Sequence, residues 1–274
     1  MATLERASAV TTAPSGTARL RQGLWGRMAG VLSFLGFLTI WQLIVLVTGI
    51  NPILLPSPGS VVAEFAESIE LGLLLPAVAD SLWALTIGLV LALVVGVVVG
   101  LLIGGSSWLD LLTGPYLYGW FATPRIALAP LIILWLGFGL SAKVLLVFIS
   151  ALLPVILSCK DGVQTVDESL IRAARVFGAR RLDVFRQVVV PFTLPFIANG
   201  IRNGIARGFV GLLIIEMTVG SGGIGTQVIR AMRSFNTARM FAFVFVLVVT
   251  ALTLITLSRK LEARVSRWRE EVYV

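Results

Sequence analysis

Long stretches without a charged side chain are the feature that most constrains the fold of this chain. Residues 28–63 and 81–109, for example, contain no Asp, Glu, Lys or Arg. A helix needs about 20 apolar residues to cross a bilayer, so each stretch is long enough for one crossing. None alternates like a β-barrel strand, so the sequence predicts an all-α, polytopic membrane protein with about six transmembrane helices. The six predicted spans are 30–49, 81–109, 126–142, 144–159, 187–218 and 240–258.

The composition excludes several other classes of protein. Charged residues make up only 13% of the chain, whereas soluble domains have about 25%, which excludes most soluble enzymes and any disordered protein. Histidine is absent and Cys159 is the only cysteine. An internal disulfide, a metal site of His or Cys ligands and a His-dependent catalytic triad are therefore excluded. We interpret the net charge of +8 as the basic bias of a membrane protein, and we expect no nucleic-acid partner.

Basic residues predict the orientation, because they gather on the cytoplasmic side of a membrane. If the N-terminus is inside, the inner segments hold 15 Lys or Arg and the outer segments hold 4. We therefore expect a multi-pass protein of the cell membrane with both termini in the cytoplasm. The predicted parts begin with a cytoplasmic tail at 1–27 and a first transmembrane helix at 28–50. An extracytoplasmic segment follows at 51–79, with a short surface helix around 60–69. The core transmembrane domain at 80–258 includes a cytoplasmic loop at 160–190, and a cytoplasmic tail follows at 259–274.

Small residues recur every four positions in two of the predicted spans. This spacing places them along one side of each helix, where small side chains let two helix backbones approach closely. The stripes predict a tight helix bundle or a dimer seam. The alternative is that they reflect glycine content or helix flexibility. The two stripes are Gly88, Ala92, Gly96, Gly100 and Gly104 in the second span and Gly200, Gly204 and Gly208 in the fifth.

Proline and charged residues at membrane depth mark a candidate translocation path. Irregular backbone inside a membrane is tolerated where it faces protein or water, so we place residues 120–136 beside the path. Ionisable residues inside a membrane usually line a pathway or pair with one another, and an anionic substrate would favour arginines. A kinked structural helix is the alternative for 120–136, and snorkelling or a structural ion pair is the alternative for Arg202. The path candidates are Arg125, Pro130, Arg202, Arg207 and Glu216.

The loop at 160–190 carries a helix–turn–helix pattern outside the spans. Residues 165–168 fit a capping box that opens a helix, and Gly178 ends that helix in a left-handed conformation. A second amphipathic segment follows, and Pro191 and Pro195 precede the next span. Two short helices with an apolar face predict docking in a groove on a partner, with a helix lying on the membrane surface as the alternative. The apolar faces consist of Leu170, Ala173, Ala174 and Phe177, and of Leu182, Phe185 and Val189.

The spacing of residues in this loop matches a family pattern. The sequence has Arg172-Ala173-Ala174, three residues, Gly178, nine residues, and then Val188-Val189-Val190-Pro191. This resembles the EAA loop of ABC transporter permeases: Glu-Ala-Ala, three residues, Gly, nine residues, Ile, any residue, Leu-Pro. Arg172 replaces the Glu, and Val replaces both Ile and Leu. The resemblance implies that the loop couples to an ATPase. The coupling residues are Glu168, Leu170, Arg172, Ala173, Ala174, Phe177, Gly178 and Pro191.

Further motifs lie within residues 30–260. They include Leu55-Pro56-Ser57-Pro58, Thr123-Pro124-Arg125-Ile126-Ala127, Leu134-Trp135-Leu136-Gly137-Phe138-Gly139, Gly200-Ile201-Arg202 and Glu216. They resemble the nitrate, sulfonate, taurine and bicarbonate branch of these permeases. The resemblance implies a type I ABC importer permease-like fold in the lipid bilayer, a homodimer, two ABC ATPase subunits and an extracytoplasmic solute-binding protein. The implied substrate is a small oxyanion such as a sulfonate, taurine or nitrate, with a heterocyclic vitamin precursor of thiamine or riboflavin type as the alternative.

The chain itself lacks a nucleotide-binding motif. A P-loop needs Gly, four residues and Gly-Lys-Ser/Thr, whereas the glycine-rich run 220–226 has no lysine and is predicted to be a flexible turn. We expect no enzyme activity, no cofactor and no metal in this chain, with ATP and Mg bound by the partner ATPase. A membrane-embedded enzyme is the alternative from another class, and the absence of His argues against it. An ion channel is a third alternative, but it would not explain the docking loop.

Overall fold

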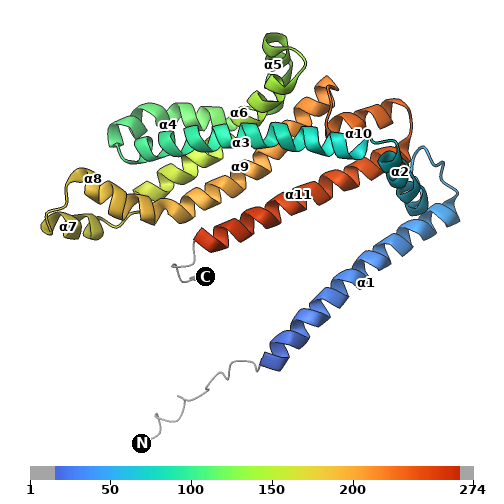
Figure 1. Ribbon diagram of the computed structural model, residues 1–274, viewed down its shortest axis with the longest axis horizontal. Coiled ribbons are helices and arrows are strands. Elements are labelled where there is room, and N and C mark those ends of the chain that lie inside the picture. Colours follow the sequence, from blue (N-terminus) through green and yellow to red (C-terminus); the bar gives the residue numbers. More distant parts are fainter. Residues whose placement is uncertain (1–15, 266–274) are drawn as a thin grey trace, which may run out of the picture. The chain divides into compact units, whose positions relative to one another are not determined.

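All regular elements in residues 16–265, the part of the chain that the structure describes, are helices (Figure 1). The structure is a computed structural model, and the chain divides into two compact units after Ser60. The first unit contains α1 (Gly16–Thr48), whose apolar part Met28–Thr48 is long enough to cross a membrane. The predicted tails lie partly outside the described residues, at 1–15 and 266–274.

The second unit holds the remaining membrane helices. It is entered through α2 (Pro58–Glu70), which corresponds to the short helix predicted around 60–69. The other elements are α3 (Leu74–Gly104), α4 (Ser107–Ala122), a 3-10 turn (Arg125–Leu128), α5 (Ala129–Leu136), α6 (Leu140–Gln164), α7 (Glu168–Val176), α8 (Arg181–Val184), a π-helical stretch (Phe185–Val189), α9 (Val190–Val219), α10 (Ile224–Arg233) and α11 (Thr237–Val265).

Five helices are long and apolar enough to cross a membrane, and a bent pair supplies a sixth crossing. This confirms the predicted all-helical fold with about six transmembrane helices. The third and fourth crossings differ from the predicted 126–142 and 144–159. The third is the bent pair, α4 followed by Arg125–Leu136 at an angle of 87°. The fourth is α6, and Lys143 lies inside it because its ammonium group is paired with Asp80 instead of being exposed to lipid.

α6 packs along both α3 and α9 within the second unit. Both stripes of small residues face it. A Cβ atom added at Gly88 of α3 would lie 2.6 Å from Cβ of Val147, and one added at Gly204 of α9 would lie 3.2 Å from Cγ2 of Val155. Larger side chains would push the helices apart, so glycine sets the helix separation here. Each stripe therefore faces a helix of the same chain.

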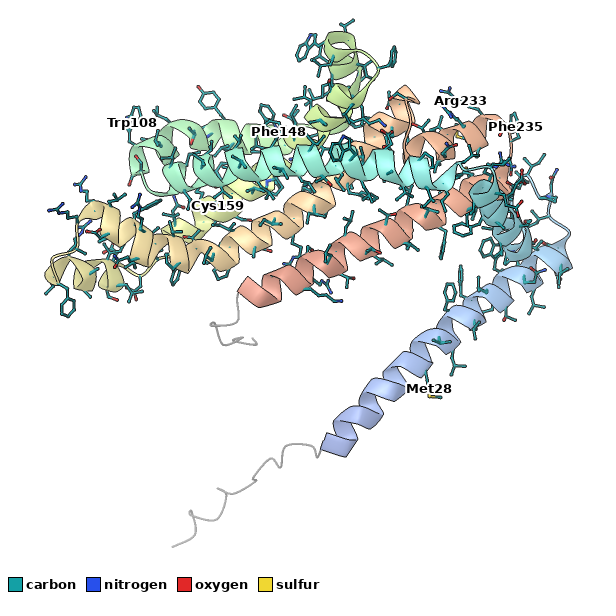
Figure 2. All side chains as sticks on the ribbon, in the orientation of Figure 1. Met28, Trp108, Phe148, Cys159, Arg233 and Phe235 are labelled. Atoms are coloured by element: carbon teal, nitrogen blue, oxygen red, sulfur yellow. The ribbon has the colours of Figure 1, made fainter. Side chains whose placement is uncertain are left out.

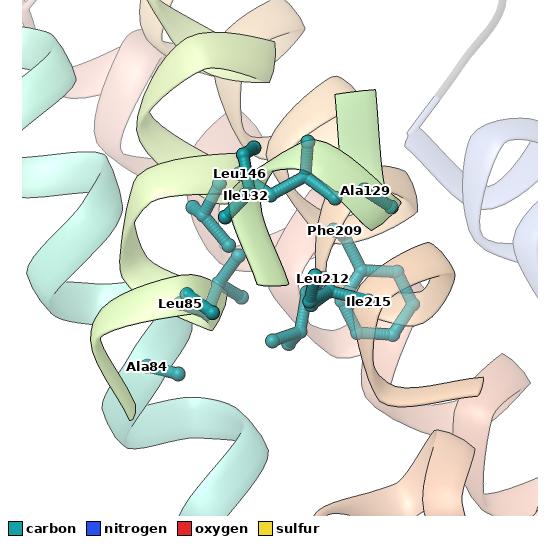
Figure 3. Close-up of a cluster of buried hydrophobic side chains, with 10 residues drawn as sticks. Ala84, Leu85, Ala129, Ile132, Leu146, Phe209, Leu212 and Ile215 are labelled. Carbon is teal, nitrogen blue, oxygen red and sulfur yellow. The ribbon is translucent and has the colours of Figure 1, made fainter. Parts of the chain in front are cut away.

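A cluster of apolar side chains anchors α5, the second half of the bent pair, to the bundle (Figure 3). Leu85 of α3, Ile132 of α5, Leu146 of α6 and Leu212 of α9 are all buried in it. In a lipid environment this cluster acts through close packing rather than through the hydrophobic effect. Its consequence is that α5 is held against α6 and α9, and residues 125–128 contact α9 as well.

The loop after Gly178 continues directly into a membrane helix. Residues Arg181–Thr218 form one helical run of 38 residues, so the expectation that Pro191 precedes the span is wrong. Pro191 lies in the first turn of α9 and Pro195 lies inside it. Proline has no N–H and therefore cannot donate a backbone hydrogen bond within a helix. The turn before Pro191 is wider than an α-helix: it is a π-helix, in which Val190 N–H donates to the carbonyl of Phe185.

Candidate coupling loop and translocation path

The start of α7 differs from the predicted capping box at 165–168. Asp167 is the capping residue, and its carboxylate accepts a 2.7 Å hydrogen bond from the backbone N–H of Ser169. This hydrogen bond holds the pKa of Asp167 below its ordinary value. Glu168 pairs with Arg172 one turn later at 3.1 Å. Both side chains are exposed, so this ion pair adds little stability, and Arg172 lies on the solvent side of the helix.

The predicted apolar face of α7 is divided between two surfaces. Ala174 is half-buried and packs against a small core of Val166, Val184 and Val189, so its place on the docking face stays a prediction. The outward side carries Phe177, which is 91% exposed, and Val176, which is 85% exposed. The outward set, here called the α7 ridge, consists of Leu170, Ala173, Val176 and Phe177. At 100° per residue these four side chains lie within one third of the helix circumference.

Gly178 joins α7 to α8 with a backbone that only glycine adopts readily. Its φ is +83°, and a Cβ atom added there would meet nothing within 4 Å. The requirement for glycine is therefore conformational and not steric. On the far side of the turn, Arg180 N–H donates to the carboxylate of Asp183 at 3.0 Å. In the second amphipathic segment, Phe185 packs on the small core while Leu182 is exposed.

Two of the path candidates meet on one aromatic ring. The guanidinium carbon of Arg125 lies 5.8 Å from the ring centroid of Phe121, and that of Arg207 lies 5.1 Å from the same centroid. Nε and Nη2 of Arg125 are shielded from solvent without a hydrogen-bond partner. Pro130, in contrast, lies in the first turn of α5, where its missing N–H costs no helical hydrogen bond. The structure thus brings Arg125 and Arg207 to the same ring, that of Phe121.

Arg202 has protein partners of its own. Its guanidinium donates to Glu262 of α11 at 3.1 Å and to the side chain of Asn199 at 2.7 Å. This arrangement corresponds to the structural ion pair that the sequence left open as an alternative. It joins α9 to α11 at the end of the second unit that carries α7.

Glu216 lies in a closed network at the other end of α9, beside α10. Its side chain has no exposed surface. The carboxylate accepts hydrogen bonds from Ser81 Oγ at 2.7 Å and from Gly225 N–H at 2.9 Å. Lys143 Nζ lies 3.6 Å from it and pairs with Asp80 as well. These contacts join α3, α6, α9 and α10, and they favour a structural role for Glu216.

The glycine-rich run 220–226 is part of the same network, so the expected flexible turn is wrong. The carbonyl oxygen of Gly222 accepts a 3.0 Å hydrogen bond from Lys143 Nζ. Gly223 has a φ of +88°, and a Cβ atom there would overlap the carboxylate of Glu216. Glycine allows the backbone to approach a buried carboxylate at this point, and the loop is held by specific hydrogen bonds.

Comparison with known proteins identifies the chain. Residues 88–268 match the family described as binding-protein-dependent transport system inner membrane component. The chain belongs to this family. Its α7 turn and its transmembrane helices are therefore those of an ABC importer permease of the inner membrane.

Similar permeases are named for different solutes. The riboflavin transport system permease protein RibX of Chloroflexus aurantiacus is 34% identical, over 89% of this chain and 91% of RibX. The putative aliphatic sulfonates transport permease protein SsuC of Bacillus subtilis is 29% identical over 89% of each chain. A solved structure of the MetNI methionine ABC transporter, in inward-facing conformations, matches with a TM-score of 0.63 and 20% identity, over 70% of this chain and 96% of the MetNI chain. This likeness shows the fold.

Sequence reasoning missed the acidic partners of two lysines in the permease. Lys160, near the end of α6, pairs with Asp110 of α4 at 2.6 Å, and Gln164 donates to the same carboxylate at 2.7 Å. Lys143 and Lys160 lie roughly 26 Å apart along α6 at 1.5 Å per residue. The spacing of the two lysines could have predicted this arrangement. Two lysines about one membrane thickness apart, near the ends of one apolar stretch, indicate one span with a charge near each end and not a boundary between two spans.

Proposed function

We propose that this permease works as a homodimer with two ABC ATPase subunits and an extracytoplasmic solute-binding protein, and that ATP hydrolysis drives import of a small solute. The α7 ridge carries the proposal. It presents Val176 and Phe177 on a helix whose opposite side is held by its own core. An amphipathic helix of this kind docks its apolar face in a groove on a partner. The partner is the ATPase, which binds ATP and Mg and performs the hydrolysis.

The proposed orientation places α7 in the cytoplasm and α10 outside. Support comes from the basic residues, of which the loop at 160–190 carries 6 and the segment at 50–79 carries none. The two termini then lie in the cytoplasm. In this orientation the Lys143 network lies near the outer end of the span and the Asp110–Lys160 pair near the inner end.

A second copy of the chain is proposed to cover part of α4 and α5. These helices expose several large apolar and aromatic side chains, among them Trp120, Leu134 and Trp135. An open apolar surface on a bent, irregular span suits contact with another protein chain better than contact with lipid alone, because irregular backbone at membrane depth needs protein or water beside it. The bent pairs of the two copies would then line the path between them.

The proposed substrate is a small oxyanion such as a sulfonate, taurine or nitrate. Relatives named for aliphatic sulfonates and for taurine support it: SsuC, and TauC of Escherichia coli, which is 30% identical over 86% of this chain. The alternative is a heterocyclic vitamin precursor, supported by RibX and by the formylaminopyrimidine permease ThiX of Halalkalibacterium halodurans, which is 28% identical. Ligand binding by the solute-binding protein that delivers to this permease distinguishes the two.

Co-purification tests the coupling role of the α7 ridge. Phe177→Glu places a charge on the ridge without touching the core, so we expect loss of the ATPase from the purified complex at normal membrane abundance. Phe235→Glu is the control, because Phe235 is also highly exposed but lies beside Arg233 at the α10 end of the second unit (Figure 2). Unchanged ATPase binding with Phe177→Glu would contradict the proposal. ATP hydrolysis by the purified permease alone would also contradict it.

A further inference from the structure

The geometry points to Phe121, Arg125 and Arg207 as an oxyanion-binding site within the translocation path, which takes the anionic group of the transported solute. This inference rests on the proposed function and names the residues that recognise the substrate. Phe121 lies in the last turn of α4, Arg125 opens the 3-10 turn after it, and Arg207 comes from α9. The bend between α4 and α5 is what brings Arg125 toward α9.

The site lies near the middle of the membrane. Arg207 is roughly 18 Å from the end of α9 at Val219, at 1.5 Å per residue, and the hydrocarbon core is about 30 Å thick. A guanidinium group at this depth is costly unless it is paired or hydrated. Two guanidinium groups around one ring add mutual repulsion to that cost.

The two arginines have no compensating charge within the described part of the chain. No acidic side chain of residues 16–265 forms an ion pair with Arg125 or Arg207. Buried polar groups in proteins nearly always have a partner, yet Nε and Nη2 of Arg125 have none. The buried lysines of the bundle differ from them: Lys143 is paired with Asp80 and Lys160 with Asp110. The two arginines therefore carry positive charge that an anionic solute can compensate.

Phe121 offers both arginines an aromatic face and no hydrogen-bond acceptor. The face of an aromatic ring attracts a guanidinium group, but it accepts no directional hydrogen bond from the N–H groups at the edge. Arginine donates through that edge as a fork to two oxygens of a sulfonate, carboxylate or phosphate group. A neutral heterocycle offers no such charge. The site thus favours the oxyanion over the vitamin precursor as the transported solute.

Binding measurements on the purified permease–ATPase complex test this inference. The probe is ethanesulfonate, and its neutral isostere ethyl methyl sulfone is the control ligand. We expect ethanesulfonate to raise the Tm of the complex and the sulfone to leave it unchanged. Arg207→Gln and Arg125→Gln should each require about tenfold more ethanesulfonate for half of the Tm increase, because a charged hydrogen bond is lost. Arg202→Gln is the matched control and should bind as the wild type does.

Arg207→Gln guards the test against a folding defect in Arg125→Gln. Arg207 is exposed in the single chain, so Arg207→Gln tests the site even if Arg125→Gln lowers the yield. Wild-type affinity for ethanesulfonate in Arg207→Gln, or an equal response to the sulfone, would overturn the inference. If the permease fails to assemble with the ATPase at all, the proposed function is wrong. Assembly with unchanged sulfonate binding in the variants contradicts this inference alone.

Discussion

At the scale of single residues, two buried charges determine how the α10 end of the permease is built. Lys143 is 1% exposed and Glu216 is 0% exposed, and both are compensated by neighbours that are far away in sequence. Removing one member of a buried ion pair typically costs about 3–5 kcal/mol, because the other charge stays buried without a partner. We expect Lys143→Met to lower the Tm of the detergent-solubilised permease by roughly 6–12 °C.

Glu216→Gln is a milder change in the same network and is compared with Lys143→Met. The amide oxygen can still accept the hydrogen bond from Gly225 N–H, the amide nitrogen can donate to Ser81 Oγ in place of the lost acceptor, and Lys143 keeps Asp80 as its anion. A smaller fall in Tm than for Lys143→Met is therefore expected. An unchanged Tm in Lys143→Met would show that the network contributes nothing to stability.

Gly178 gives a second prediction at this scale, on coupling. Valine resists a φ of +83°, with a strain of about 1–3 kcal/mol. Gly178→Val should therefore reorient the α7 ridge and reduce uptake, while the membrane bundle persists at normal abundance. Gly178→Asn should retain more uptake, because Asn tolerates the left-handed region better than Val. Normal uptake with Gly178→Val would mean that this turn does not position the coupling surface.

At the scale of helices, the contact between α3 and α6 depends on the absence of side chains. A Cβ atom at Gly100 would lie 2.6 Å from Cβ of Cys159 and 2.7 Å from the carbonyl oxygen of Ile156. We expect Gly100→Ala to destabilise the permease by about 1–3 kcal/mol through overpacking. Gly119→Ala in α4 is the control, because a Cβ there meets nothing within 4 Å and Ala favours a helix over Gly by about 1 kcal/mol. Equal Tm values for the two variants would rule out a tight α3–α6 contact.

At the scale of the whole molecule, the basic residues predict the direction in which the bundle crosses the membrane. Cysteine labelling of intact cells should modify Glu67→Cys in α2 and leave Gln164→Cys at the end of α6 unmodified. Glu67 and Gln164 are exposed in the structure, and the native Cys159 is fully buried, so background labelling is low. The opposite pattern would reverse the orientation and place the α7 ridge outside the cell, away from any ATPase.

The class of fold could be predicted from the sequence because the membrane restricts the possible structures so strongly. A backbone in lipid has to satisfy its own hydrogen bonds, so long apolar stretches become helices wherever they occur. The glycine stripes follow from the same physics: where lipid removes the hydrophobic driving force, close packing of small residues joins helices. The turn at Gly178 was predictable as well, because its conformation is a local property of the backbone.

Only the tertiary structure decided where the charges lie and what they contact. Lys143 interrupts an apolar stretch, and by itself it indicates a boundary between spans. It lies inside α6 because Asp80 and Glu216, from other helices, compensate it. Arg202 has its acid in α11, whereas Arg125 and Arg207 share an aromatic ring and have no acid among the described residues. An ion pair inside a membrane depends on three-dimensional proximity, and the charge pattern along the chain does not determine which partners meet.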